Sequence, residues 1–116
     1  MKGLELQAFR RGITPPAPAT LARYGLSAEE WLGLLAAQGW KCPICLKDAA
    51  DVKLNTDHEH VRGWEKMKPS QKKEYTRGVL CNYCNYRRVH STISGKIAQR
   101  IADYINAYET RKGVAA

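Results

Sequence analysis

The most regular apolar pattern lies near the carboxyl-terminal end of the chain. Apolar side chains recur there every three or four positions, at Ile93, Ile97, Ile101, Ile105 and Tyr108, with Tyr104 beside them. This interval places the side chains along one face of a helix. We therefore expect a core-facing helix over about residues 94–110.

A second helix is predicted upstream. Ser27 and Glu30 have the spacing of a capping box, in which each side chain accepts a hydrogen bond from the backbone N–H of the other residue. The apolar face that follows consists of Trp31, Leu32, Leu34 and Leu35. Gly39 is a typical residue beyond the end of a helix. The pattern predicts a helix over about residues 28–38 that packs in the core.

Between these helices the pattern predicts one short strand and a long polar loop. Residues 52–58 alternate between apolar and polar for a few positions, which is typical of a strand. A turn is expected at Arg62-Gly63. Residues 64–77 are polar, basic and interrupted by a proline, which predicts a loop with a short helix after Ser70. A further helix is expected to begin near the last cysteines and to carry Asn85.

The chain has 116 residues, which suffices for one domain and is short for two. We expect a flexible arm over residues 1–20, a single α+β domain over 21–112 and a tail over 113–116. The three prolines between positions 15 and 18 favour an extended polyproline-type segment in the arm. The basic residues of the arm either contact phosphate or belong to a solvated tail.

Two Cys-x-x-Cys pairs, Cys42/Cys45 and Cys81/Cys84, are the strongest chemical signal. Four thiolates suit a closed, tetrahedral structural zinc site. No secretory hydrophobic segment opens the chain, and no stretch approaches the ~20 apolar residues of a membrane span. We therefore expect an intracellular protein, in which zinc is favoured over two disulfides. A redox-active Cys-x-x-Cys is a third alternative.

The segment between the two pairs carries a second kind of site. Its 35 residues exceed the ~15–20 of a zinc ribbon, and they include Asp57, His58 and His60. Asp57 and Asn85 can supply oxygen ligands to a hard cation, and an unligated His58 can act as a base near neutral pH. Taken singly, Asp57 and His58 could be a surface pair, and Asn85 a helix cap. Their combination with the flanking cysteines favours a joint catalytic role.

Asp57 and His58 are adjacent, which constrains the strand that carries them. Neighbouring residues of a regular strand point to opposite faces. Both side chains can serve one site only if the strand ends or bulges there, as functional strands often do. We therefore expect an irregularity at this position.

The net charge of +8, from 19 basic and 11 acidic residues, suits either a positively biased surface or binding of a polyanion. The basic residues gather around the cysteine–histidine region. Those expected to contact DNA are Arg62, Lys66, Lys68, Lys72, Lys73, Arg77, Arg87 and Arg88.

The order of these motifs resembles the recombination endonuclease VII family of the HNH (His-Me finger) nucleases. The matching residues are Cys42, Cys45, Asp57, His58, His60, Arg77, Gly78, Val79, Leu80, Cys81, Asn82, Cys84 and Asn85. The resemblance covers roughly residues 24–90. It implies a small zinc-bound ββα-metal (His-Me finger) domain with flanking N- and C-terminal helices, in which a β-hairpin and a helix clamp one divalent cation.

The resemblance also implies a role for each matching residue of the site. His58 would be the general base, and Asp57 and Asn85 would bind the catalytic cation, Mg²⁺ or Mn²⁺. His60 would contact or orient the scissile phosphate. The products would carry 5′-phosphate and 3′-hydroxyl ends. Arg87 and Arg88 stand where the junction-resolving relative carries an acidic residue, so no further acidic ligand is expected from that turn.

We therefore expect a metal-dependent DNA endonuclease or nickase that acts on duplex or branched DNA. The alternatives are a non-catalytic, zinc-stabilised nucleic-acid-binding module and a thiol-disulfide or zinc-storage protein. No membrane partner is expected, and both a monomer and a dimer are compatible with the sequence. The expected location is the cytoplasm or nucleoid of a bacterial host, which is compatible with a phage origin. His90 is expected to be structural or to face phosphate.

Overall fold

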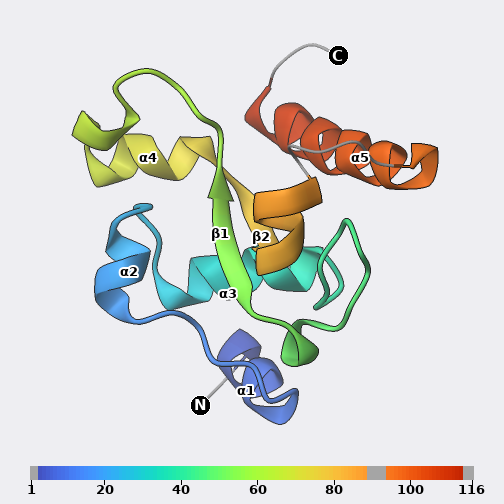
Figure 1. Ribbon diagram of the computed structural model, residues 1–116. Helices are drawn as coiled ribbons and strands as arrows, with labels where there is room; N and C mark the ends of the chain where they lie inside the picture. Colours follow the sequence, from blue (N-terminus) through green and yellow to red (C-terminus); the bar gives the residue numbers. More distant parts are fainter. Residues whose placement is uncertain (1–2, 89–93, 114–116) are drawn as a thin grey trace.

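The computed structural model describes residues 3–88 and 94–113, with the backbone alone at Arg88. Two strands and several helices make a small α+β structure (Figure 1). In chain order the elements are α1 (Gly3–Arg10), α2 (Pro18–Ala22), α3 (Ala28–Ala37), the 3₁₀ turn η1 (Ala49–Asp51), β1 (Leu54–His58), the 3₁₀ turn η2 (Trp64–Lys66), α4 (Pro69–Tyr75), β2 (Thr76–Cys81), the π-helical turn η3 (Cys84–Arg88) and α5 (Gly95–Lys112).

Strands β1 and β2 pair antiparallel and form the whole sheet of the described chain. Leu54 pairs with Cys81 at one end, and Asp57 pairs with Gly78 near the other. Val79 belongs to a core cluster with α3, whereas Leu80 belongs to a second cluster with α5. The hairpin therefore lies between α3 on one face and α5 on the other.

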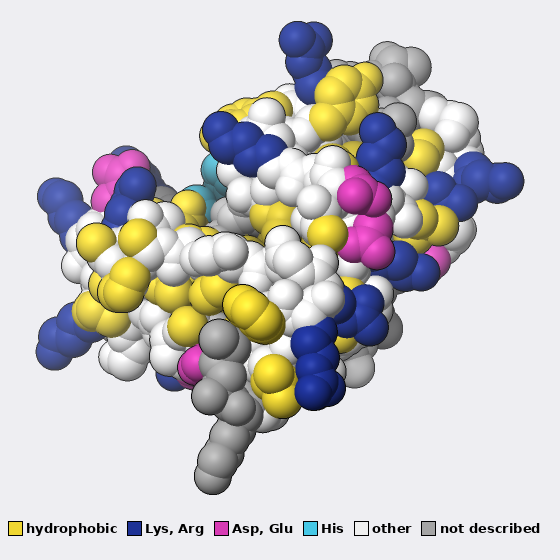
Figure 2. Space-filling view, turned by 90° about the horizontal axis from the view of Figure 1, so that it is seen from below, with side chains coloured by type: hydrophobic (Ala, Val, Ile, Leu, Met, Phe, Trp, Pro, Cys, Tyr) yellow, Lys and Arg dark blue, Asp and Glu magenta, His cyan; other side chains and the backbone are white. Residues whose placement is uncertain are grey.

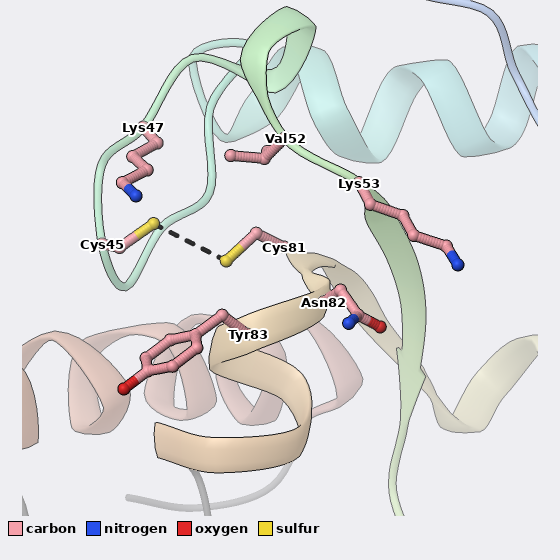
Figure 3. Close-up of a pocket in the computed structure, with 7 residues that line it drawn as sticks. All are labelled: Cys45, Lys47, Val52, Lys53, Cys81, Asn82 and Tyr83. Carbon is pink, nitrogen blue, oxygen red and sulfur yellow. Dashed lines mark hydrogen bonds between the residues drawn. The ribbon is translucent and has the colours of Figure 1, made fainter.

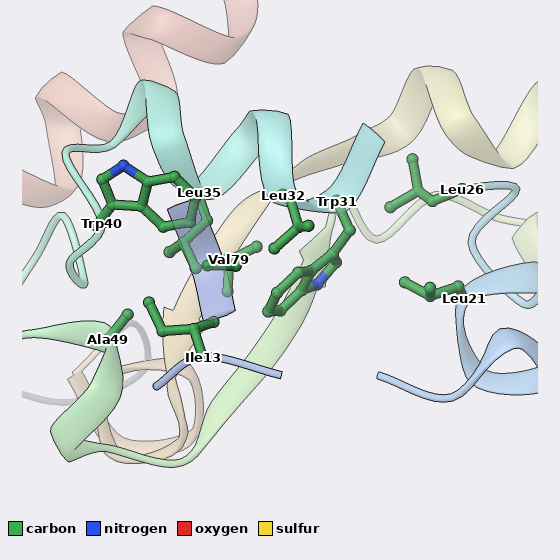
Figure 4. Packing of buried hydrophobic residues seen from close by; sticks show 10 residues of the cluster. Ile13, Leu21, Leu26, Trp31, Leu32, Leu35, Trp40, Ala49 and Val79 are labelled. Atoms are coloured by element: carbon green, nitrogen blue, oxygen red, sulfur yellow. The ribbon is translucent and has the colours of Figure 1, made fainter. Parts of the chain in front are cut away.

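Helix α3 provides the centre of the larger core. Trp31, Leu32 and Leu35 are fully buried, and they meet Val79 of β2 (Figure 4). The predicted capping box is confirmed: Glu30 N donates to Ser27 Oγ at 3.1 Å, and Ser27 N donates to Glu30 Oε1 at 2.9 Å. The helix therefore begins where the sequence predicts, and Gln38 follows its last turn.

The amino-terminal residues are folded, contrary to the extended arm that the prolines favour. Residues 3–10 form α1, which packs against α3, and Ala8 is 1% exposed. Ile13 follows at 6% exposure and joins the same core as Trp31. Burial of apolar surface outweighs the local preference for extended backbone here. Pro15 and Pro16 lie in the connection to α2, and Pro18 is the first residue of that helix.

The smaller core surrounds the cysteines and is closed by α5. Ile97, Ile101 and Ile105 pack against a cluster that includes Leu80 and Tyr104. This confirms the predicted stripe for its described members, while Ile93 lies outside the described residues. Arg100 Nη1 donates to the carbonyl of Ile44 at 3.3 Å and ties the helix to the first cysteine loop.

The polar segment between the strands is more ordered than a plain loop. Gly63 has a φ of +81°, consistent with the predicted turn, and η2 follows it. Helix α4 begins with Pro69 at its first position, where the missing N–H costs nothing.

None of the helices within residues 3–88 and 94–113 combines the length and apolar character that crossing a membrane requires.

Candidate functional site

The segment Asp57–His60 divides its side chains between two faces of the hairpin. Asp57 pairs with Gly78, but His58 pairs with Thr76, so Arg77 is an extra residue in β2. The register therefore shifts between Asp57 and His58, as the sequence predicts. The alternation of the strand is nevertheless kept, so the irregularity does not bring Asp57 and His58 to one face, which is what a shared site was expected to require. The acidic residues face α5, and the histidines face the segment that contains η2.

The histidine face is a stack of three rings. His58 lies 3.9 Å from Trp64 between ring centroids, with the rings 16° from parallel. On its other side His60 lies at 4.8 Å and 2°. Tyr24 approaches His58 from the end of α2, with the two ring centroids 5.8 Å apart. His58 is therefore fixed between two flat neighbours, while His60 forms the exposed end of the stack.

The surroundings of His58 favour its neutral form. Burial lowers the pKa of the imidazole below its usual 6.5, and the positive charge of His60 adds to the effect. Asp57 opposes this shift without reversing it, and Arg77 and Lys72 make smaller contributions that also lower the pKa of His58. A neutral imidazole has a free nitrogen lone pair near neutral pH, which is what proton abstraction from water requires.

The two histidines line a surface recess with basic residues at its rim. The recess has a volume of about 510 Å³ and is lined by His58, His60, Val61, Arg62, Gly63, Trp64, Glu65 and Lys66. Figure 2 shows histidine surface in a hollow, with Lys and Arg side chains nearby. Lys72 of α4 lies 4.5 Å from the Trp64 ring centre. This arrangement suits an approaching anion.

The Asp57 carboxylate lies on the opposite face and is 5% exposed. Arg77 donates to both of its oxygens, from Nε to Oδ2 at 2.8 Å and from Nη2 to Oδ1 at 3.2 Å. Tyr104 of α5 donates to Oδ2 at 2.8 Å. Arg77, which the sequence analysis expects to contact DNA, is therefore directed toward Asp57, and its side chain is only 15% exposed.

Glu59 is held by α5 in the same way. Tyr108 donates from its hydroxyl to Glu59 Oε1 at 2.8 Å, and Lys112 forms an ion pair with the same oxygen at 3.2 Å. Sequence reasoning did not find Tyr104 or Tyr108, because both fit the apolar stripe of a core helix. A signal was present, since tyrosines four positions apart on a buried face each bring a hydroxyl that needs a partner.

Asp57 and Asn55 carry oxygen atoms of the kind that a hard cation prefers, but the Arg77 guanidinium bonds both carboxylate oxygens of Asp57. Asp57 uses three of about four carboxylate acceptor directions, so one remains on Oδ1. Asn55 is two residues earlier on the same face of β1, and its Oδ1 is buried without a hydrogen-bond partner. The partly exposed Asn85 makes no side-chain hydrogen bond to any described residue, and none joins it to Asp57.

The four cysteines converge on one point. Their sulfurs all lie within 4.8 Å of one another, which can hold one metal ion. Cys45 of the loop after α3 and Cys81 at the end of β2 face each other, with the sulfurs 3.7 Å apart (Figure 3). A tetrahedral site with bonds of ~2.3 Å separates its sulfurs by about this distance. Burial raises the pKa of the Cys84 thiol, and a bound cation would reverse that shift.

The other basic residues expected to contact DNA have different surroundings. Arg62, Lys66 and Lys68 are exposed on the segment between the strands, and Arg87 is exposed on η3. Lys73 is exposed as well, but it pairs with Glu30 of α3. His90 and the side chain of Arg88 lie outside the described residues.

Known proteins similar to this chain place it in a family. Gene 59 protein of Mycobacterium phage D29 is 32% identical over 87 residues, which cover 73% of this chain and 46% of that protein. Gene 59 protein of Mycobacterium phage L5 is 32% identical over 66 residues, 56% of this chain and 34% of that protein. This chain spans less than half the length of these two relatives, and no solved structure matches it. The family model of recombination endonuclease VII matches residues 18–107, and the chain therefore belongs to the recombination endonuclease VII family.

Proposed function

We propose that this chain is a metal-dependent DNA endonuclease or nickase of the His-Me finger type. It would hydrolyse phosphodiester bonds to leave 5′-phosphate and 3′-hydroxyl ends. Membership of the endonuclease VII family supports the reaction class. The observation that carries the proposal is the place of His58, which is fixed between two rings at the wall of a basic recess.

In this proposal His58 is the general base. A nitrogen of its ring takes a proton from water as the water attacks phosphorus. Because the flanking rings restrict the rotation of the imidazole, little orientational freedom is lost when substrate binds. His60, exposed at the end of the stack, contacts the scissile phosphate and orients it.

Asp57 and Asn85 would hold the catalytic cation, Mg²⁺ or Mn²⁺. The cation, when bound, supplies positive charge that offsets the charge building on the phosphate and on the leaving oxygen. Because Arg77 bonds both oxygens of Asp57 in this structure, the ion would take the place of that guanidinium. The buried, unpartnered Oδ1 of Asn55 is a further acceptor on the same face.

The four cysteines would bind one structural zinc. A site made only of thiolates leaves no open position for a substrate, so this ion has no direct part in hydrolysis. Its role is to hold the first cysteine loop against the end of β2, next to η3 and Asn85.

DNA is the proposed substrate, and its backbone would lie along basic residues of the segment between the strands and of η3. The proposed contacts are Arg62, Lys66, Lys68, Lys72, Lys73, Arg87 and Arg88. Such contacts release counterions, so binding should weaken steeply as salt rises. The gene 59 proteins come from phages, and we propose a phage setting for this chain as well.

Replacing His58 by Ala tests the base assignment. We expect nicking of supercoiled plasmid with Mg²⁺ or Mn²⁺ to fall by at least ~10²-fold, since a positioned base typically contributes 10²–10⁴-fold. DNA binding at equal salt should stay near the parental level. A wild-type protein that binds DNA but cleaves nothing with any divalent cation would instead support the non-catalytic binding module. Parental nicking by the variant would contradict the role of His58.

A further inference from the structure

The cysteine site is open on one side. A recess of about 250 Å³ is lined by two of its four cysteines, Cys45 and Cys81 (Figure 3). Cys45 is partly exposed and Cys81 is 4% exposed, whereas Cys42 and Cys84 are fully buried and do not line the recess. A reagent that enters from solution therefore meets Cys45 first and Cys81 next.

We propose that Cys45 and Cys81 form an oxidation site for low-molecular-weight disulfides that carry carboxylates. Their sulfurs, now 3.7 Å apart, would close to ~2.05 Å in a disulfide, a movement of about 1.7 Å. The new bond joins one Cys-x-x-Cys pair to the other, which distinguishes it from a redox-active Cys-x-x-Cys. The inference goes beyond the proposed nuclease activity and does not depend on it.

The oxidation consists of two successive thiol–disulfide exchanges. The Cys45 thiolate attacks one sulfur of the reagent, which forms a mixed disulfide and releases one reagent thiolate. The Cys81 thiolate then attacks the Cys45 sulfur, which forms the Cys45–Cys81 bond and releases the second reagent thiolate. The two cysteines lose two electrons and the reagent gains them, so no proton is taken up or released.

The side chains around the recess favour an anionic reagent. Lys47 and Lys53 are exposed there, and none of the described residues that line the recess is acidic. In Figure 3 the Lys47 side chain extends toward Cys45, whereas the Lys53 side chain is directed away. Lys47 is therefore the residue expected to attract a carboxylate toward the Cys45 sulfur, and salt should weaken this attraction.

Oxidation would also release the zinc proposed for this site. Cys42 and Cys84 would supply the two remaining thiolates, fewer than the three or four protein ligands of zinc sites. The Cys45–Cys81 bond would keep the first cysteine loop joined to the end of β2. Cys84, the first residue of η3, would lose its tie to the loop.

The test treats the zinc-loaded wild type with oxidised glutathione and blocks the remaining thiols at successive times. We expect two thiols to be lost and one zinc to be released per chain, the zinc being measured with a chromogenic chelator. Peptide mass spectrometry should find glutathione on Cys45 first and the Cys45–Cys81 bond afterwards. A first modification at another cysteine, a first disulfide between other cysteines, an unresolved mixed disulfide, or retention of all four thiols or of the zinc would overturn the inference.

Lys47→Glu tests the charge preference, with Lys41→Glu as the matched control. Lys41 is an exposed lysine of the same loop that does not line the recess, and both variants keep the four cysteines. At low salt, Lys47→Glu should react about 3-fold or more slowly than the wild type with oxidised glutathione, and faster with cystamine, a cationic disulfide. Lys41→Glu should react with both at nearly the wild-type rates. Equal rates in the two variants with both reagents would contradict the preference for anionic disulfides.

Discussion

At the residue scale, Gly78 allows three elements to meet. A Cβ at this position would lie 2.5 Å from Gln38 Oε1 and 2.8 Å from the Tyr104 ring. Gln38 is held by bonds to both backbone groups of Val79, at 2.9 Å and 2.7 Å, so its amide occupies the outer edge of β2. Tyr104 is held by Asp57. Neither neighbour can move aside without losing a partly buried hydrogen bond.

We therefore expect Gly78→Ala to lower the free energy of unfolding by about 1–3 kcal/mol, the usual cost of overpacking. Gly33→Ala is the matched control. Gly33 lies inside α3 with a Leu4 methyl at 3.8 Å, so an added methyl should raise stability by about 0.5–1 kcal/mol. Urea unfolding of both variants measures whether each substitution lowers or raises the free energy of unfolding. A Gly78→Ala protein as stable as the parent would show that the contact with Gln38 and Tyr104 relaxes freely.

Residue-scale prediction from the sequence succeeded where neighbours along the chain decide the outcome. The capping box of Ser27 and Glu30 spans three positions. The irregularity at Asp57-His58 is present as predicted, but it leaves the two side chains on opposite faces. The partners of Asp57 could not be predicted in this way. Tyr104 is 47 positions away, and its hydroxyl carries no periodic signal that distinguishes a bonded tyrosine from an ordinary core aromatic.

At the element scale, helices were predicted best where an apolar face is regular. The described part of α5 follows its isoleucine stripe. Helix α1 was missed because its burial depends on α3, a partner that the local pattern does not reveal. Helix α4 has no buried residue, and its link to α3 is the ion pair of Lys73 with Glu30.

That ion pair predicts a pH-dependent contribution to stability. The bond from Lys73, and then that from the Ser27 backbone, lower the pKa of Glu30 below its usual 4.5. Because the unfolded chain binds the proton more readily, the contribution is complete above pH 4.5 and is lost as the pH falls through the lowered value. Both side chains are largely exposed, so its size is under about 1 kcal/mol.

Lys73→Met should therefore be less stable than the parent at pH 7, and the difference should vanish in acid. Lys68→Met removes the same charge from an exposed lysine outside the pair and should lack this pH dependence. Urea unfolding of both variants from pH 7 to pH 3 measures the difference. If the difference in free energy of unfolding between Lys73→Met and the parent stayed constant across this pH range, the ion pair would be excluded as the source of that difference.

At the scale of the whole molecule, the cysteine site joins the two cores. It connects the loop after α3 to the end of β2, and its cluster includes Tyr104 of α5. Two Cys-x-x-Cys pairs predicted this convergence from the sequence, since paired spacing of this kind is typical of one shared ion. The fold of residues 3–13 against α3 could not be anticipated from such a motif.

Removal of the metal should unfold the chain. Structural zinc contributes on the order of 10 kcal/mol in zinc-finger peptides, which is comparable to the whole stability of a small domain. We expect one zinc per chain by elemental analysis, and loss of both zinc and the thermal transition in Cys81→Ser. His58→Ala keeps all four cysteines and should retain the zinc. Two disulfides found by mass spectrometry would contradict the metal assignment.

The extra residue in β2 also bears on which changes of length the chain tolerates. One residue removed from β1 between Leu54 and His58 would exchange the faces of its carboxylates and imidazoles. Residues 61–68 lie outside both strands and are mostly exposed, so insertions there leave the pairing untouched. Natural variation in length among related chains should therefore concentrate in this connection, where it can alter the rim of the recess without disturbing the hairpin.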